Sequence, residues 1–359
     1  MNGNGSLRVV VFARATEIGP STRYRFTQHR ARLAAEGVEL DVRPLFGPTW
    51  FRIRRVRSRA LRVLLACAYA PIRLAARHVQ RATIGAADRV IVEHQLFPYL
   101  PAWIELALLR RGRFVLEFDD AIWLTPMHRR KLAALARAAD RVVVGNEFLA
   151  AFARRCNERV DVIPTSVDVL RYPAREPKVD APRAARPFVV GWIGLPINFP
   201  ALESIAAPLA RLAREIPLVV RVISAGRPDL PGVTVEPIEW NEATETRELA
   251  RLDAGVMPLP DDEWSRGKCG LKVLQYFAAS VPVVAAPVGV NAEIVRDREN
   301  GLLARSEDEW HDRLRELAKD RALAERLAAA GRATVERDFA AATIGARIAA
   351  AWRAARSWR

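Results

Sequence analysis

Short apolar runs and helical periodicities alternate along almost the whole chain. The runs are of the type that is buried on both faces of a parallel sheet. In the first half they lie at 7–12, 38–42, 90–92, 113–118, 141–144 and 160–163. In the second half they lie at 188–193, 218–223, 233–237, 253–256 and 283–286. The alternation predicts two doubly wound α/β domains, each built on a parallel sheet.

Domain boundaries follow from where this alternation stops. With 359 residues the chain is long enough for two domains. The proline-rich stretch 173–187 has no periodicity, so it is predicted to be a linker between a first domain at 1–172 and a second at 188–340. The tail at 341–359 is helical in pattern.

The sequence favours a cytoplasmic protein without a resident metal. Cys67, Cys156 and Cys269 lie far apart and match neither a metal nor a redox spacing, so a reducing compartment is expected. Residues 1–6 are polar and lead directly into the first strand, so no signal peptide is expected. No uncharged apolar run approaches the roughly 20 residues that a spanning helix needs.

The formal net charge of +15 is concentrated in one window. No acidic residue lies between Asp41 and Asp88, and residues 50–83 read as a basic amphipathic helix. Its apolar stripe is Leu61, Leu64, Leu65, Ala68, Ile72, Ala75 and Val79. The arginines predicted for the other side are Arg52, Arg55, Arg59, Arg62, Arg73, Arg77 and Arg81.

Such a helix can lie on an anionic membrane, which would place the protein at the inner face of the cytoplasmic membrane. The alternative is that the stripe packs on the protein's own sheet, and the two are compatible if the arginines face lipid. Nucleic acid is not expected as a partner, because no aromatic-interleaved groove accompanies the charge. A general enrichment in arginine and alanine would also raise the charge without any function.

The segment 262–295 has the pattern of an anion site. Gly267 and Gly270 interrupt the chain just before a helical run, which Pro282 is expected to end. Arg266, Lys268 and Lys272 crowd the start of that helix, with no acidic residue between 263 and 293. A helix N-terminus with nearby cations suits a diphosphate. The alternative is a solvated basic loop beside an ordinary helix.

Polar residues at the ends of strands mark a second site in the first domain. The carboxyl ends of parallel strands border the ligand crevice of doubly wound sheets. The candidates there are Gly19, Arg23, Arg25, His94, Asp119 and Asp120. Repulsion between Asp119 and Asp120 is expected to raise one of their pKa values, which suits acid–base or hydrogen-bonding work on a hydroxyl group. The alternatives are solvated arginines, a loop histidine and a carboxylate pair that caps the next helix.

The segment from 270 to 293 also resembles family-4 glycosyltransferases of GT-B architecture. The matching residues are Gly270, Gln275-Tyr276-Phe277-Ala278, Pro282-Val283-Val284, Gly289 and Glu293. The turn GPSTRYR at 19–25 and the segment FDDAIW at 118–123 are similar to the family as well, so the resemblance covers nearly the whole chain. Most of the family carries two glutamates eight positions apart, and these positions are Gly267 and Gln275 here.

The resemblance implies two Rossmann-like domains that face a cleft, with the C-terminal helix crossing back to the first. It implies a retaining, metal-independent bacterial hexosyltransferase that needs no cofactor and moves a sugar from a nucleotide-sugar donor. The acceptor is expected to be a lipid-linked or polysaccharide glycan of the cell envelope. Two alternatives stay open: a nucleotide-sugar epimerase, and a non-catalytic membrane scaffold that has lost the glutamates.

Residue roles follow from the same resemblance and from the anion-site pattern. Donor binding is expected at Gly19, Gly194, Arg266, Lys268, Gly270, Lys272, Gln275 and Asn291. Acceptor binding is expected at Arg23, Arg25 and His94. Catalysis is expected from Asp119, Asp120 and Lys268. Gln275 stands where the family's ribose-holding glutamate would be, and its amide oxygen can still accept hydrogen bonds.

Overall fold

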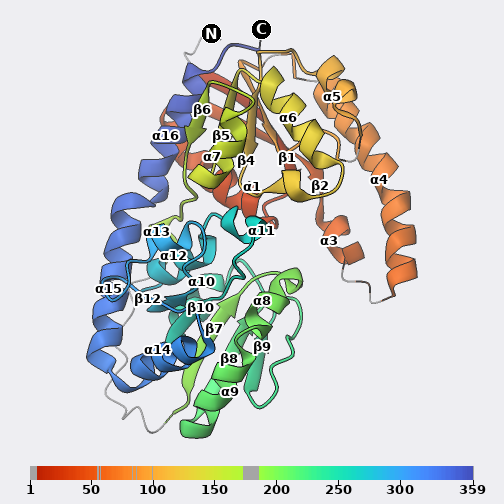
Figure 1. Cartoon of the computed structure of the whole chain (residues 1–359). Helices are drawn as coiled ribbons and strands as arrows, with labels where there is room; N and C mark the ends of the chain where they lie inside the picture. Colours follow the sequence, from red (N-terminus) through yellow and green to blue (C-terminus); the bar gives the residue numbers. More distant parts are fainter. Residues whose placement is uncertain are drawn as a thin grey trace. The chain divides into compact units, whose positions relative to one another are not determined.

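The computed structural model describes residues 6–54, 56, 58–82, 84–85, 87–98, 100–172 and 186–358. It divides into two compact units, drawn in Figure 1. The first contains Met1–Thr165 together with Ala341–Arg359, and the second contains Ser166–Ala340. The predicted linker at 173–187 lies outside the described residues except for its last two positions.

The first unit is built on a six-stranded sheet in which every pair of neighbouring strands is parallel. The strand order is β2-β1-β3-β4-β5-β6. The order reverses between β1 and β3, so their carboxyl ends form the topological switch point where such sheets bind ligands. The bounds are Leu7–Ala15 (β1), Val38–Phe46 (β2), Arg89–Glu93 (β3), Val115–Phe118 (β4), Arg141–Val144 (β5) and Val160–Val162 (β6).

Helices connect these strands, and one predicted helix is broken. The segment 21–36 has the sequence pattern of one helix ending at Gly37, but it forms three short pieces, because Phe26 leaves helical geometry at φ −129° and buries its ring against Trp352. The pieces are Pro20–Arg25 (α1), Thr27–His29 (η1) and Arg30–Ala35 (α2). The remaining helices before the unit boundary are Pro48–Arg54 (α3), Arg59–Ala82 (α4), Ala102–Leu108 (α5), Ile122–Leu124 (η2), His128–Ala138 (α6) and Glu147–Arg154 (α7).

The last helix, Ala341–Ala354 (α16), completes the core of the first unit. Ile344, Ile348 and Trp352 join the buried residues of β1 and β2 in one hydrophobic cluster. Close approach is possible because Gly345 has no side chain: a Cβ there would lie 3.0 Å from His29 Nδ1. The chain therefore returns to its first sheet after building the second unit.

The second unit repeats the architecture with a different strand order, β12-β11-β10-β7-β8-β9, again all parallel. Counted within the unit this is the Rossmann order, and it reverses between β7 and β10. The bounds are Phe188–Ile193 (β7), Leu218–Ile223 (β8), Thr234–Ile238 (β9), Ala254–Met257 (β10), Val283–Ala285 (β11) and Leu302–Leu303 (β12).

The helices of the second unit show where local sequence signals mislead. Glycine commonly ends a helix, but Gly331 lies inside α15 (Arg321–Asp338), where a Cβ would approach the Phe277 ring to 2.5 Å. The segment 201–215 has the pattern of one helix but is divided between two. The other helices are Val169–Arg171 (η3), Pro196–Asn198 (η5), Phe199–Glu203 (α8), Ala206–Glu215 (α9), Glu245–Ala250 (α10), Glu263–Arg266 (α11), Leu271–Ala278 (α12), Asn291–Ile294 (α13) and Glu307–Lys319 (α14).

The basic window forms two helices, α3 and α4, and the apolar stripe of α4 does not pack on the sheet. The apolar stripe of α4 faces outward, with Leu64 66% exposed, Ile72 64% and Val79 62%. Arg73 and Arg77 turn inward and donate to the backbone carbonyls of Leu45 and Arg43 at 2.5 and 2.6 Å. The expectation that the stripe packs on the sheet is therefore wrong. Arg55 and Arg57 lie outside the described residues.

Candidate functional site

The switch point of the first sheet gathers several of the predicted residues. His94 follows β3 directly and holds a left-handed backbone with φ 61°. Asp119 follows β4, and Gly19 precedes α1 in the loop after β1. Sequence-distant residues therefore meet at one edge because parallel strands end there together.

His94 and Asp119 form a hydrogen-bonded pair, with His94 Nε2 3.1 Å from Asp119 Oδ1. Burial disfavours the charged imidazole, but the hydrogen bond to Asp119 and the charges of Asp119 and Glu93 raise the pKa of His94. Burial likewise opposes ionisation of Asp119, yet the His94 hydrogen bond, with the charges of His94 and Arg25, lowers its pKa to about 2. Both shifts favour the ionised forms of the pair.

This pair corrects two expectations about the carboxylates. Repulsion from Asp120 was expected to raise a pKa, whereas His94 and Arg25 shift that of Asp119 downward. The helix-capping alternative also fails, because Ala121 is the N-cap of the following η2 and has no side-chain cap bond. Asp119 is instead oriented towards His94.

Two further carboxylates lie behind the pair. Glu93 accepts from the Arg14 backbone N–H at 2.7 Å and from Thr22 Oγ1 at 3.1 Å. Glu117 accepts from Arg25 Nε at 2.8 Å. Burial raises the pKa of Glu93, and it raises that of Glu117 to about 7 although Arg25 opposes the shift. One oxygen of each carboxylate has no hydrogen-bond partner among the described residues.

The two predicted acceptor arginines are buried, so the alternative that they are solvated is wrong. Arg23 is 4% exposed, with its guanidinium 4.7 Å from the Tyr24 ring centroid. Arg25 is 2% exposed and donates both to Glu117 and to the carbonyl of Ile163, the latter at 2.7 Å. We therefore assign Arg25 to the framework of the site.

The switch point of the second sheet brings together Gly194 and Lys272. Gly194 follows β7, and a Cβ on it would lie 2.6 Å from the Trp192 ring and 3.0 Å from Lys272 Cε. The Lys272 ammonium lies 5.2 Å from the Trp192 ring centroid. The missing side chain at position 194 therefore leaves room for the lysine arm beside the first turn of α12.

Two glycines with left-handed backbone conformations shape the start of α12 and the loop packed beside it. Gly270 caps the helix with φ +69°, and Gly289, with φ +53°, lies so close to Arg266 that a Cβ would approach its carbonyl oxygen to 2.8 Å. Arg266 itself turns to Asp261, with Nε 2.8 Å from Oδ1. Lys268 lies over the Trp264 ring at 4.8 Å. Of the three cations predicted to bind the diphosphate, Arg266 therefore already forms an ion pair with Asp261.

Gln275 and Asn291 lie deeper on the same side of the second unit. Gln275 Nε2 donates to Glu245 Oε1 at 3.1 Å, and Trp240 Nε1 donates to Glu245 Oε2 at 2.5 Å. Because a carboxylate only accepts, the amide must present its NH₂ group to Glu245, which turns its oxygen elsewhere. Asn291 Oδ1 lies near Gly270 and is buried without a hydrogen-bond partner among the described residues.

Sequence reasoning missed Glu93, Glu117 and Glu245. The first two had a signal, since each is a carboxylate within a short apolar strand, VIVE or VLEF. Glu245 had no such signal, because its partners, Trp240 and Gln275, lie five positions before it and thirty positions after it in the chain. Within the described residues, no group of three or more His, Cys, Asp or Glu side chains is arranged to hold a metal ion.

Comparison with known proteins points to one class. Residues 240–320 match the family model described as "Glycosyl transferases group 1". D-inositol 3-phosphate glycosyltransferase of Xylanimonas cellulosilytica is 29% identical over 215 residues, which are 52% of this chain and 50% of that protein. The chain thus spans about half the length of this curated relative.

Solved structures share the fold over nearly the whole chain. Sucrose-phosphate synthase from Thermosynechococcus elongatus has a TM-score of 0.67 at 16% identity, covering 97% of this chain and 98% of that one. HepE from Anabaena, in complex with UDP-glucose, has a TM-score of 0.67 at 14% identity, covering 96% and 98%. WaaG, a glycosyltransferase involved in lipopolysaccharide biosynthesis, has a TM-score of 0.64 at 14% identity, covering 97% and 100%. The chain has the two-domain α/β fold of GT-B proteins, and its segment 240–320 is similar to the group 1 glycosyl transferases.

Proposed function

We propose that this protein is a glycosyltransferase that moves a sugar from a nucleotide-sugar donor to a glycan or glycolipid acceptor. The observation that carries the proposal is the arrangement of Lys272 over Gly194 at the switch point of the second sheet. This lysine lies within the segment that matches the group 1 family. The HepE structure with UDP-glucose supports a nucleotide-sugar as the donor.

The second unit would hold the donor diphosphate. The N-terminus of α12 offers backbone N–H groups and a partial positive charge, and Gly194 and Gly270 permit close approach. Lys268 and Lys272 add two ammonium groups, which can stabilise a leaving nucleoside diphosphate without a metal ion. Gln275 would accept a hydrogen bond from the ribose, and we propose retention at the anomeric carbon in line with the family resemblance.

The first unit would hold the acceptor. Asp119 remains ionised at neutral pH, because its pKa is about 2, so it suits hydrogen bonding to a sugar hydroxyl better than proton abstraction. His94 would hold Asp119 in place and present its other ring nitrogen, Nδ1, which is buried and has no partner among the described residues. Asp120 would bind a second hydroxyl, and Gly19 and Arg23 would complete the pocket.

Transfer assays on lysine variants test the donor assignment. Lys268→Ala and Lys272→Ala are each expected to lower transfer about 10²- to 10³-fold, as loss of one charge-stabilising donor does in other enzymes. Lys319→Ala is the matched control, because it removes the same charge from an exposed position on α14. Unchanged transfer in both site variants would refute the diphosphate assignment.

Binding separates the enzyme from the non-catalytic scaffold. A nucleoside diphosphate at 100 times its dissociation constant stabilises a protein by about 2.7 kcal/mol, which a thermal shift detects. We expect one base family to shift the parent protein and not Lys272→Ala. A folded parent that responds to no nucleoside diphosphate or nucleotide-sugar would favour the scaffold.

We further propose that α4 rests on an anionic membrane. Its outward stripe is an exposed apolar surface, and the positive charges of Arg52 and Arg59 lie near the start of α4, with no acidic residue between 41 and 88. Charge complementarity favours an acidic lipid surface over a second protein. Among the described residues, no helix is long and apolar enough to cross a membrane.

Vesicle sedimentation tests this surface. The parent is expected to bind phosphatidylglycerol vesicles more tightly than phosphatidylcholine vesicles, and the triple variant Leu64→Ser, Ile72→Ser, Val79→Ser is expected to lose binding. A control with Leu170→Ser and Ile197→Ser removes exposed apolar side chains from the second unit. Equal vesicle binding by all three proteins would contradict the proposal. It would also be contradicted if light scattering showed a dimer of the parent that the triple variant no longer forms, because the stripe would then be a dimer interface.

A further inference from the structure

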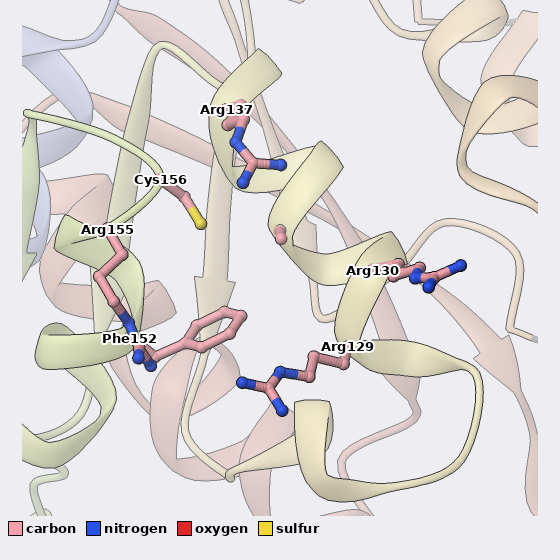
Figure 2. A pocket seen from close by; sticks show the side chains of 7 residues that line it. Arg129, Arg130, Arg137, Phe152, Arg155 and Cys156 are labelled. Atoms are coloured by element: carbon pink, nitrogen blue, oxygen red, sulfur yellow. The ribbon is translucent and has the colours of Figure 1, made fainter.

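A groove between α6 and α7 is lined mainly by arginine side chains, unlike the two sites described above. It encloses a cavity of about 590 Å³, a volume within the range of small-ligand sites. Figure 2 shows Arg129, Arg130 and Arg137 on α6, and Phe152, Arg155 and Cys156 on or just after α7. We call it the arginine groove.

The arginines of this groove have no carboxylate partners in the part of the chain that the structure describes. Arg129, Arg130, Arg137 and Arg155 are exposed and make no ion pair or hydrogen bond with any described residue. Arginines nearby are paired: Arg154 with Glu147 at 2.6 Å and Arg159 with Asp140 at 2.6 Å. No acidic residue lies between 120 and 140. Positive charge is thus left uncompensated around the hollow.

The spacing of these charges indicates an extended ligand. Arg129 and Arg137 are eight residues apart on one helix, which is about 12 Å at 1.5 Å per residue. The positive charge is therefore spread along the groove. Guanidinium groups bind phosphate and carboxylate through paired N–H donors, so the groove suits a chain with several anionic groups. Arg155, 5.6 Å from the Phe152 ring centroid, is held in position by that ring.

A buried aromatic stack links the wall of the groove to the segment that carries Asp119 and Asp120. Trp123, three residues after Asp120, stacks on Phe152 with ring centroids 4.3 Å apart and an interplanar angle of 3°. Helices in a parallel α/β unit run opposite to the strands. Arg129 in the first turn of α6 therefore lies towards the carboxyl edge, where Asp119 is, and Arg137 lies towards the other edge.

We propose that the arginine groove binds an acidic oligosaccharide, the chain of an anionic acceptor glycan whose growing end lies at Asp119 and His94. The proposal rests on the glycosyltransferase function proposed above and specifies its acceptor class. Single-stranded nucleic acid fits less well, because it needs exposed aromatic rings for base stacking and Phe152 is only 5% exposed.

Direct binding tests the groove without any transfer reaction. The probes are an oligogalacturonate hexamer, the neutral maltohexaose and inorganic tripolyphosphate, measured by calorimetry at constant ionic strength. The parent is expected to bind oligogalacturonate and not maltohexaose. Arg137→Ser with Arg155→Ser is expected to weaken oligogalacturonate binding at least about tenfold. Arg30→Ser with Arg111→Ser is the charge-matched control, since both residues are exposed, make no pair with described residues and lie off the groove.

Each other outcome overturns the proposal. Equal weakening in the two double variants would mean that general charge and not the groove attracts the probe. Tripolyphosphate binding that the groove variant loses, without oligogalacturonate binding, would identify a phosphate site in place of a glycan site. A parent that binds no probe would remove the site altogether.

The thermal shift that a nucleoside diphosphate causes through the second unit is measured on the same proteins. Loss of that shift with retained oligogalacturonate binding would contradict the proposed donor function alone. Retained shift without oligogalacturonate binding would contradict the groove alone.

Discussion

The contact between Gln275 and Glu245 allows a quantitative test of the second unit. Both side chains are buried, 3% and 2% exposed, and Nε2 lies 3.1 Å from Oε1. The perturbation is Gln275→Glu, which places a second carboxylate against the first. The compensating double variant Glu245→Gln, Gln275→Glu exchanges the two groups: residue 245 would then accept from Trp240 through its amide oxygen and donate to residue 275 through its amide nitrogen.

The size of the effect follows from the distance. Two unit charges 3.1 Å apart repel by about 5 kcal/mol at an effective dielectric constant of about 20. Protonation of one carboxyl relieves the repulsion and costs about 1.4 kcal/mol for each pH unit above the ordinary glutamate pKa of about 4.3. Gln275→Glu is therefore expected to lower the free energy of unfolding by up to about 5 kcal/mol at pH 8 but by only about 2 kcal/mol at pH 6.

The sign of this pH dependence follows from the raised pKa of the carboxylate pair. A group whose pKa is higher in the folded state contributes least at high pH, so the single variant should lose stability as the pH rises. The assay is urea unfolding of the parent, both single variants and the double variant at pH 6 and pH 8. We expect the double variant to recover to within about 1 kcal/mol of the parent. A double variant no more stable than Gln275→Glu would refute the coupling.

Three further predictions concern the two sites and the core. Gly194→Ala should displace both the Trp192 ring and the Lys272 arm, since its Cβ would lie 2.6 Å from the ring and 3.0 Å from Cε, so it should lower the melting temperature and reduce the further shift that a nucleoside diphosphate causes; an undiminished ligand shift would contradict this. The parent should lose stability as the pH rises from about 5 through about 7, because burial raises the pKa of Glu117 to about 7 in the folded state. Glu117→Gln should remove this loss, and identical pH–stability curves for the two proteins would refute the reasoning. Gly331→Val should cost about 1–3 kcal/mol, because its side chain would overlap the Phe277 ring, and an unchanged urea midpoint would contradict the packing.

The sheets were predictable because buried parallel strands leave a direct mark on the sequence. Runs such as 188–193 and 283–286 are apolar throughout, and the prediction of two parallel α/β units is confirmed by the strand pairing and by the solved structures. The meeting of His94 and Asp119 was also predictable in outline, because both follow strands of one parallel sheet. What the sequence did not contain was the hydrogen bond between them, which lowers the pKa of Asp119.

Features that depend on partners far along the chain could not be predicted. The periodicity of α4 showed which residues share a face but not which face turns inward, since that depends on carbonyl groups on β2. Gly331 looked like a helix end because glycine is common there, yet its neighbour across the core is Phe277, 54 positions away in sequence. In each case tertiary packing overrides a local signal.

The inward arginines of α4 also bear on aggregation. β2 is the outermost strand of the first sheet, so one side of its backbone would be open to another chain. Arg77 and Arg73 occupy the carbonyls of Arg43 and Leu45, which alternate with those that face β1 and which an incoming strand would need. Helix α4 thus covers the edge strand with hydrogen-bond donors, and a chain without this helix would expose β2 to pairing with a strand of another molecule.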